Sequence, residues 1–141
     1  MKPYPFEISN ETLKELKSRY PNIGKNSHIG KIAVEIVKLY FLNKNKKATF
    51  NTKIKGVDIE VAYLGKKECY EIKGTADNNF SWNKLYVSGT PCYKGLIAGT
   101  TTLIRVTNVG ELKMNLFFIK YSEHFTLISE PRWKVRKLNN T

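Results

Sequence analysis

Two neighbouring segments in which apolar and polar residues alternate constrain the fold of this chain more than any other feature. In residues 56–64, Val57, Ile59 and Val61 occupy alternate positions, and residues 68–74 repeat the pattern with Tyr70 and Ile72. A period of two predicts strands that bury one face. The short turn at residues 65–67 predicts that the two strands pair as an antiparallel hairpin.

Upstream of the hairpin, apolar residues recur at helical spacing over residues 27–43, with Ser27 as the expected N-cap. The apolar face is wide, so we expect this helix to pack on a sheet. A shorter helix is expected over residues 9–20, with Ser9 as a candidate cap and Pro21 directly after it.

The rest of the sequence predicts strands and loops around one further helix. These are strands at 48–54, 102–109, 116–121 and 125–129, a short helix at 80–87 capped by Ser81, and loop from 90 to 100. The order predicts an α/β (α+β) fold, a mixed β-sheet of about five strands flanked by helices. We expect a single domain over 1–141, with a core of about 28–121, the N-terminal helix 9–20 and a basic C-terminal tail 130–141.

Charge limits the classes of partner. Among 141 residues, 24 Lys and Arg stand against 12 Asp and Glu, a formal net charge of +12. Such an excess favours a polyanion as partner, nucleic acid first. The apolar runs fall short of the ~18 residues of a transmembrane helix, and Cys69 and Cys92 lack zinc-site spacing. We therefore expect a cytoplasmic protein that does not interact with membranes.

The scarce acids are the most informative residues. Asp58 and Glu60 lie in one predicted strand of the hairpin, and Glu71 and Lys73 lie in the other. If both polar faces point the same way, Asp58, Glu71 and Lys73 converge. Crowded carboxylates repel unless something compensates, and Mg²⁺ prefers such oxygen ligands. Lys73 could then orient or deprotonate a water that attacks a phosphodiester. Glu60, on the Asp58 face, is an alternative third acid.

Asp58 followed across the hairpin by Glu71-Ile72-Lys73 resembles the motif of the PD-(D/E)xK nuclease superfamily. That resemblance implies a restriction-endonuclease-like core with Asp58 and Glu71 as metal ligands and Lys73 as the catalytic lysine. It also implies a helix glutamate a few residues after a glycine, which here is Glu35 after Gly30. The implied catalytic set is Glu35, Asp58, Glu71 and Lys73, and the implied cofactor is Mg²⁺, for which Mn²⁺ substitutes.

Two points in this resemblance stay open. The residue before Asp58 is Val57, where the family motif has proline. Glu35 could instead form salt bridges with Lys31 and Lys38 on its own helix.

The function expected from this resemblance is a Mg²⁺-dependent DNA endonuclease, of restriction or restriction-associated type. The alternatives are a structure-selective nuclease that resembles Holliday-junction resolvases, and a nucleic-acid-binding module without activity. Cleavage of both strands favours a homodimer or a partner subunit. The candidate DNA contacts are basic, amide or aromatic residues: Lys53, Lys55, Trp82, Asn83, Lys84, Arg132, Lys134 and Arg136.

Overall fold

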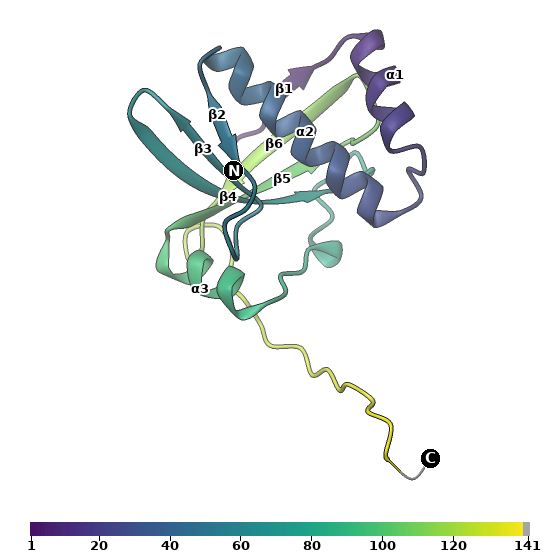
Figure 1. Cartoon of the computed structure of the whole chain (residues 1–141), viewed down its shortest axis with the longest axis vertical. Helices are drawn as coiled ribbons and strands as arrows, with labels where there is room; N and C mark the ends of the chain where they lie inside the picture. The colour runs from purple at the N-terminus through teal and green to yellow at the C-terminus, as the bar shows by residue number, and fades with distance from the viewer. Residues whose placement is uncertain (140–141) are drawn as a thin grey trace.

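The computed structural model describes residues 1–139 of the chain, so the last two residues of the expected tail lie outside the described part. Within residues 1–139, six strands form one mixed sheet with α1 and α2 over one face and α3 over the other (Figure 1). In chain order the elements are β1 (Tyr4–Glu7), α1 (Asn10–Arg19), α2 (Asn26–Lys44), β2 (Thr49–Asn51), β3 (Ile59–Tyr63), β4 (Lys66–Gly74), the 3₁₀ turn η1 (Trp82–Lys84), α3 (Thr90–Ala98), β5 (Thr101–Thr107) and β6 (Lys113–Ile119).

The strands lie in the order β1-β6-β5-β4-β3-β2, with β4 and β5 parallel and the other neighbours antiparallel. The mixed sheet flanked by helices is therefore confirmed, and β3 pairs with β4 as the alternation predicts. The sixth strand, β1, was not expected. It consists of four residues that include Pro5 and lies at the edge of the sheet, paired with β6. An edge strand is where a sheet tolerates proline.

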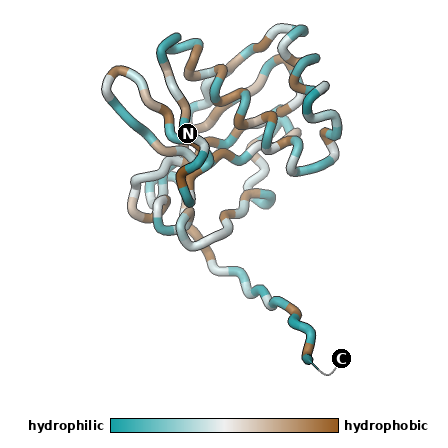
Figure 2. Tube along the Cα trace, in the orientation of Figure 1, coloured by the Kyte–Doolittle hydropathy of each residue, from teal (hydrophilic) through white to brown (hydrophobic). Residues whose placement is uncertain are grey.

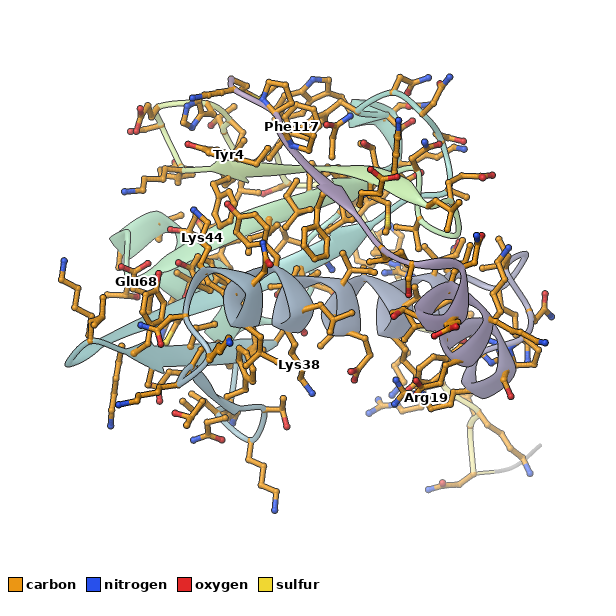
Figure 3. All side chains as sticks on the ribbon, turned by 90° about the horizontal axis from the view of Figure 1, so that it is seen from above. Tyr4, Arg19, Lys38, Lys44, Glu68 and Phe117 are labelled. Atoms are coloured by element: carbon orange, nitrogen blue, oxygen red, sulfur yellow. The ribbon has the colours of Figure 1, made fainter. Side chains whose placement is uncertain are left out.

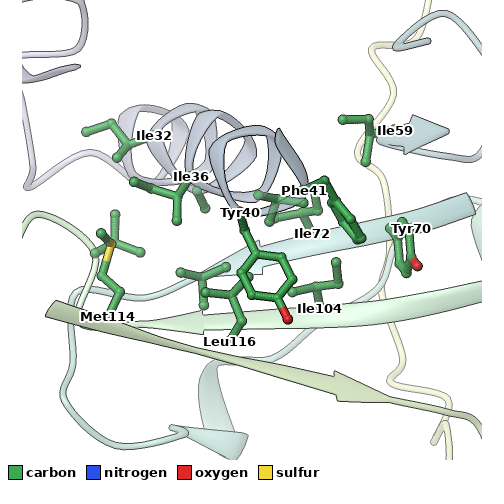
Figure 4. Close-up of a cluster of buried hydrophobic side chains, with 14 of the residues drawn as sticks. Ile32, Ile36, Tyr40, Phe41, Ile59, Tyr70, Ile72, Ile104, Met114 and Leu116 are labelled. Carbon is green, nitrogen blue, oxygen red and sulfur yellow. The ribbon is translucent and has the colours of Figure 1, made fainter. Parts of the chain in front are cut away.

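Helix α2 covers the main core. Ile32 and Ile36 are fully buried against the sheet, beside Ile72 of β4 and Leu116 of β6 (Figure 4). Val37 is fully buried in the same cluster. Burial of this kind stabilises the fold by roughly 1.5–3 kcal/mol for each large side chain. Of the helices in residues 1–139, none, α2 included, is both long and apolar enough to cross a bilayer.

A glycine allows α2 to approach β4 closely. A Cβ atom at Gly74 would lie 2.7 Å from the Cβ of Ala33, which is closer than such atoms approach.

The start of α2 differs from the expected one. The cap expected at Ser27 is wrong, because α2 begins at Asn26 after Lys25, which makes no side-chain capping bond. His28, in the first turn of α2, stabilises the turn that precedes the helix, because its Nδ1 accepts a hydrogen bond from the Asn22 amide at 3.0 Å.

The expected loop at residues 90–100 is wrong, because it contains α3. Pro91 lies in the first turn, where a helix needs no amide donor, and Gly99 ends the helix in the left-handed region at φ 78°. Gly95 is required by packing, since a Cβ there would lie 2.6 Å from the Oγ1 of Thr101. The proline and glycines that suggested a loop therefore have roles in a short helix. Pro91 lies at its start, Gly95 allows its close packing and Gly99 ends it.

Two smaller expectations also fail. The helix expected over residues 80–87 is the single turn η1, and Ser81 precedes it with φ 54° and makes no capping bond. The expected strand at 125–129 is only an isolated bridge between Tyr121 and Phe125. Beyond it the chain extends away from the body as a tail in which hydrophilic and hydrophobic residues are mixed (Figures 1 and 2).

Candidate functional site

The carboxylates of Asp58 and Glu71 meet at one end of the β3–β4 hairpin. The register pairs Ile59 with Tyr70, so one further step places Asp58 opposite Glu71 on the same face. The Asp58 amide donates to the Tyr70 carbonyl at 3.1 Å, and Asp58 Oδ2 accepts from the Ile72 amide at 2.7 Å. These bonds place the Asp58 carboxyl group beside that of Glu71, on the same cavity.

Glu71 is the more buried of the two acids, with 8% of its surface exposed. Burial first, and then the neighbouring Asp58 carboxyl, raise the pKa of Glu71, which lies at about 7. A hydrogen bond from the Cys92 thiol and the positive charge of Lys73 act against this rise. Glu71 therefore changes its charge near neutral pH, where an ordinary glutamate is already ionised.

Cys92 of α3 donates its thiol proton to Glu71 Oε2 at 2.5 Å. Burial, and after it the contact with Glu71, raises the pKa of Cys92 to about 12. The thiol is therefore protonated at neutral pH and acts as a donor. It fixes the orientation of one Glu71 oxygen, a role that sequence reasoning missed because it required the unexpected helix α3.

A close backbone contact fixes α3 beside Asp58. Gly56 lies in the turn before Asp58 with φ 80°, and a Cβ on it would lie 2.6 Å from the Cβ of Pro91. Pro91 is in the first turn of α3 and directly precedes Cys92. Gly56 thus allows the turn before Asp58 to pack closely against the first turn of α3. That turn of α3 carries Cys92, which binds Glu71.

The four residues that the sequence singled out line one cavity of about 340 Å³. Asp58, Glu71 and Lys73 border it from the sheet, and Glu35 borders it from α2. Lys73 is half-buried and lies two positions beyond Glu71 on the same face of β4. The remaining lining residues are Tyr20, Ser27, Gly30, Lys31, Val34 and Ile72.

Glu35 differs from the other three, because cations already surround its carboxylate. Its two oxygens lie 3.9 Å from Arg19 Nη2 and 3.5 Å from Lys38 Nζ. Figure 3 shows Arg19 and Lys38 on the same side of α2. The alternative pairing with Lys38 is therefore present, while Lys31 lies instead near the ring of Tyr20, 5.8 Å from its centroid.

No cluster of three or more Asp, Glu, His or Cys side chains that could hold a metal ion occurs within residues 1–139. The pair of Asp58 and Glu71 nevertheless suits a site of few protein ligands. Each carboxylate has one oxygen engaged by an amide or thiol donor, and within residues 1–139 Asp58 Oδ1 and Glu71 Oε1 accept no such bond. Mg²⁺ commonly takes one or two carboxylates and completes its shell with water and phosphate oxygens. Asp58 and Glu71 therefore fit a divalent cation. Glu60, the alternative third acid, is not among the residues that line the cavity and pairs across the hairpin with Cys69.

The expected DNA contacts are exposed and lie on three separate segments of the chain. Lys53 and Lys55 precede Asp58, and Trp82, Asn83 and Lys84 form η1. Lys84 is already paired, with Nζ 2.9 Å from Asp77 Oδ2. The remaining three, Arg132, Lys134 and Arg136, lie in the extended tail.

Arg105 is a second residue that sequence reasoning missed. It pairs with Lys73 across the parallel strands β4 and β5 and is 2% exposed. Its Nε donates to the carbonyl of Phe80 at 2.9 Å, and its Nη2 donates to the carbonyl of Ser81 at 3.2 Å. Burial lowers its pKa, and Asp77 opposes that shift. The guanidinium of Arg105 thus links the segment before η1 to strands β4 and β5.

Comparisons of the chain with models of protein families, with curated proteins and with solved structures find no match.

Proposed function

We propose that the protein is a divalent-metal-dependent DNA endonuclease whose sheet and α2 form a restriction-endonuclease-like core. The observation that carries the proposal is the meeting of Asp58 and Glu71 at a cavity that Lys73 also lines. Two adjacent carboxylates, one of them buried, are costly in a folded protein without a compensating cation, and Lys73 offsets only part of the rise in the Glu71 pKa. The net charge of +12 favours a polyanionic substrate such as DNA.

The proposal assigns each residue a task. Asp58 and Glu71 would hold the cation through Oδ1 and Oε1, while the Ile72 amide and the Cys92 thiol fix their other oxygens. A bound Mg²⁺ would supply charge stabilisation at the phosphate and a more acidic water. Lys73 would orient the attacking water or stabilise the negative charge that develops on the phosphate.

Glu35 has a weaker claim to be a ligand. Its carboxylate lines the cavity, but Arg19 and Lys38 compete for it. We propose that it would contribute a third carboxylate at the cavity wall, without holding the cation directly. Its replacement would then reduce activity less than replacement of Asp58.

DNA is the proposed partner, and the basic surface supplies the long-range attraction. Cleavage of both strands of a duplex would need two active sites, supplied by a second copy of the chain or by a partner subunit.

The proposal is tested by incubating the purified protein with supercoiled plasmid, a linear duplex and a four-way junction. Each substrate is offered with Mg²⁺, with Mn²⁺ and with EDTA. Asp58→Ala and Lys73→Ala should abolish product formation, and Lys67→Ala is the matched control, since Lys67 is exposed on the same strand β4.

The pattern of products separates the alternatives. Cutting at a fixed duplex sequence supports a restriction activity, while paired nicks confined to the four-way junction support a structure-selective nuclease. Binding without any metal-dependent product would contradict the nuclease proposal and support the binding module. Robust cleavage that survives both Asp58→Ala and Lys73→Ala would refute the site.

A further inference from the structure

Trp82 stands out among the exposed residues because it is stacked on another ring beside the candidate site. Its ring lies 4.2 Å from that of Phe80, centroid to centroid, with an interplanar angle of 29°. Phe80 packs in turn edge-on against Phe117 of β6 at 5.2 Å. Phe80 therefore covers one face of Trp82, and 46% of the Trp82 surface remains exposed.

The segment that holds Trp82 is fixed by buried polar contacts. Arg105 binds the carbonyls of Phe80 and Ser81, and its guanidinium lies 5.9 Å from the centroid of the Phe80 ring. The Ser81 hydroxyl donates to Asp77 at 2.6 Å. Stacking on Trp82 would therefore cost little conformational entropy, because the ring and its support are already ordered.

Arg105 also places this stack near the candidate site. Arg105 pairs with Lys73 on the neighbouring strand, so both side chains leave the sheet on the face that also carries Glu71. Its Nη1 lies 3.4 Å from the carbonyl of Lys73. The short turn η1 follows the end of β4 in the chain and lies beneath it in Figure 1.

An indole with one supported and one exposed side matches the π-face of a nucleobase, and the net charge of +12 favours a nucleic acid over a neutral aromatic ligand. Resting on the function proposed above, we propose that Trp82, backed by Phe80, is a stacking subsite for one unpaired base of the DNA substrate. A base within an intact duplex is stacked on its neighbours and cannot offer its face. The preferred substrate is therefore DNA with an unpaired base near the cleaved phosphate.

The chain contains two tryptophans, Trp82 and Trp133, which allows a direct optical test. Trp133→Phe leaves Trp82 as the only indole, and Trp82→Phe leaves Trp133. Each variant is titrated in EDTA with a single-stranded thymidine oligonucleotide of about 16 nucleotides and with a blunt duplex of similar length. We expect the single strand to quench the fluorescence of the variant that keeps Trp82, and the duplex to quench it far less.

Affinity gives a second measure. Trp82→Ala should weaken single-strand binding ~5- to 150-fold, the equivalent of one lost base stack, and leave binding of the blunt duplex within about twofold. Trp82→Phe keeps an aromatic ring and should restore part of the affinity. Thermal unfolding of each variant establishes that it is folded.

Two results would overturn the subsite: quenching confined to the variant that keeps Trp133, or an equal loss of single-strand and duplex affinity in Trp82→Ala. These results differ from failure of the proposed nuclease, because the titration needs neither metal nor cleavage. Cleavage that depends on Asp58 and Lys73 without quenching at Trp82 would refute the subsite alone. Quenching at Trp82 without any cleavage would support the subsite and refute the nuclease.

Discussion

The buried side chains beneath α2 form one large apolar cluster, whereas the layer beneath α3 combines a small apolar cluster with Glu71 and Arg105. Both layers are built on the same strands, which present alternate residues to the two sides. The α2 layer gains stability from every side chain that it buries. Burial stabilises the α3 layer less, because the buried carboxylate of Glu71 and the buried guanidinium of Arg105 each lose hydration. Within residues 1–139, the buried charged side chains are Glu71 and Arg105, and Glu71 also reaches the cavity that Glu35 of α2 lines from the other side.

The largest expected effect separates chemistry from stability. Lys73→Met removes the ammonium group beside Glu71 and keeps much of the side-chain volume. Cleavage should fall by about 10²- to 10⁴-fold, the usual contribution of one group that positions a proton or stabilises charge. The free energy of unfolding should change by less than about 1 kcal/mol. Single-turnover cleavage and urea unfolding measure the two effects, with Lys67→Met on the same strand as control.

The opposite pattern is expected in the α2 layer. Leu116→Ala leaves a cavity beneath α2, because Leu116 is fully buried there (Figure 4). The free energy of unfolding should fall by about 2–5 kcal/mol. Turnover for each folded molecule, measured well below the unfolding temperature, should stay unchanged. A folded Leu116→Ala protein that had lost its turnover would break the division between the two layers.

Glu71→Gln should make the metal-free protein more stable above neutral pH. The pKa of Glu71 is raised in the folded state to about 7 from an ordinary 4.5, so ionisation of this group destabilises the fold as pH rises through that interval. Gln carries no charge, and the gain should approach about 3 kcal/mol at about pH 8 and vanish near pH 4. Urea unfolding at both pH values measures it.

The control for this prediction is Glu111→Gln, at an exposed acid outside the site. It should change the stability by no more than about 0.5 kcal/mol at either pH. A Glu71→Gln protein that is no more stable than the wild type at about pH 8 would contradict the cost assigned to this buried carboxylate.

The smallest expected effect concerns the thiol in the α3 layer. The Cys92 hydrogen bond lowers the pKa of Glu71, so Cys92→Ala should raise it and move the acidic limb of the pH–rate profile up by about one unit. Cys92→Ser keeps a donor and should move the limb less. Cys69→Ala is the matched control on β4. Equal shifts in Cys92→Ala and Cys92→Ser would mean that packing, and not the hydrogen bond, tunes Glu71.

The hairpin and α2 could be predicted because their signals are periodic and local. Alternation in β3 and β4 also placed Asp58, Glu71 and Lys73 on one face, and the short turn between the strands left only one simple pairing. Helix α3 could not be predicted, because Pro91 and Gly99 are equally typical of loops and of the two ends of a short helix. Strand β1 could not be predicted, because it has only four residues and one of them is a proline.

The parts of the site that could not be predicted depend on packing between distant segments. The bond from Cys92 to Glu71 joins residues 21 positions apart through the unexpected helix. Arg105 contacts the carbonyl of Phe80 across 25 positions, and no local pattern signals a buried guanidinium. Glu35 shows an intermediate case, since Lys38 could be foreseen from helical spacing and Arg19 on α1 could not.

The central claim is that Asp58 and Glu71 together bind a divalent cation. Titration with Mn²⁺ at about pH 8, where Glu71 is ionised, tests it directly, with free Mn²⁺ measured by electron paramagnetic resonance. We predict one bound Mn²⁺ for each wild-type chain, a loss of affinity of at least about tenfold in Asp58→Asn, and a smaller loss in Glu35→Gln. Equal affinity in the wild type and in Asp58→Asn would contradict the account.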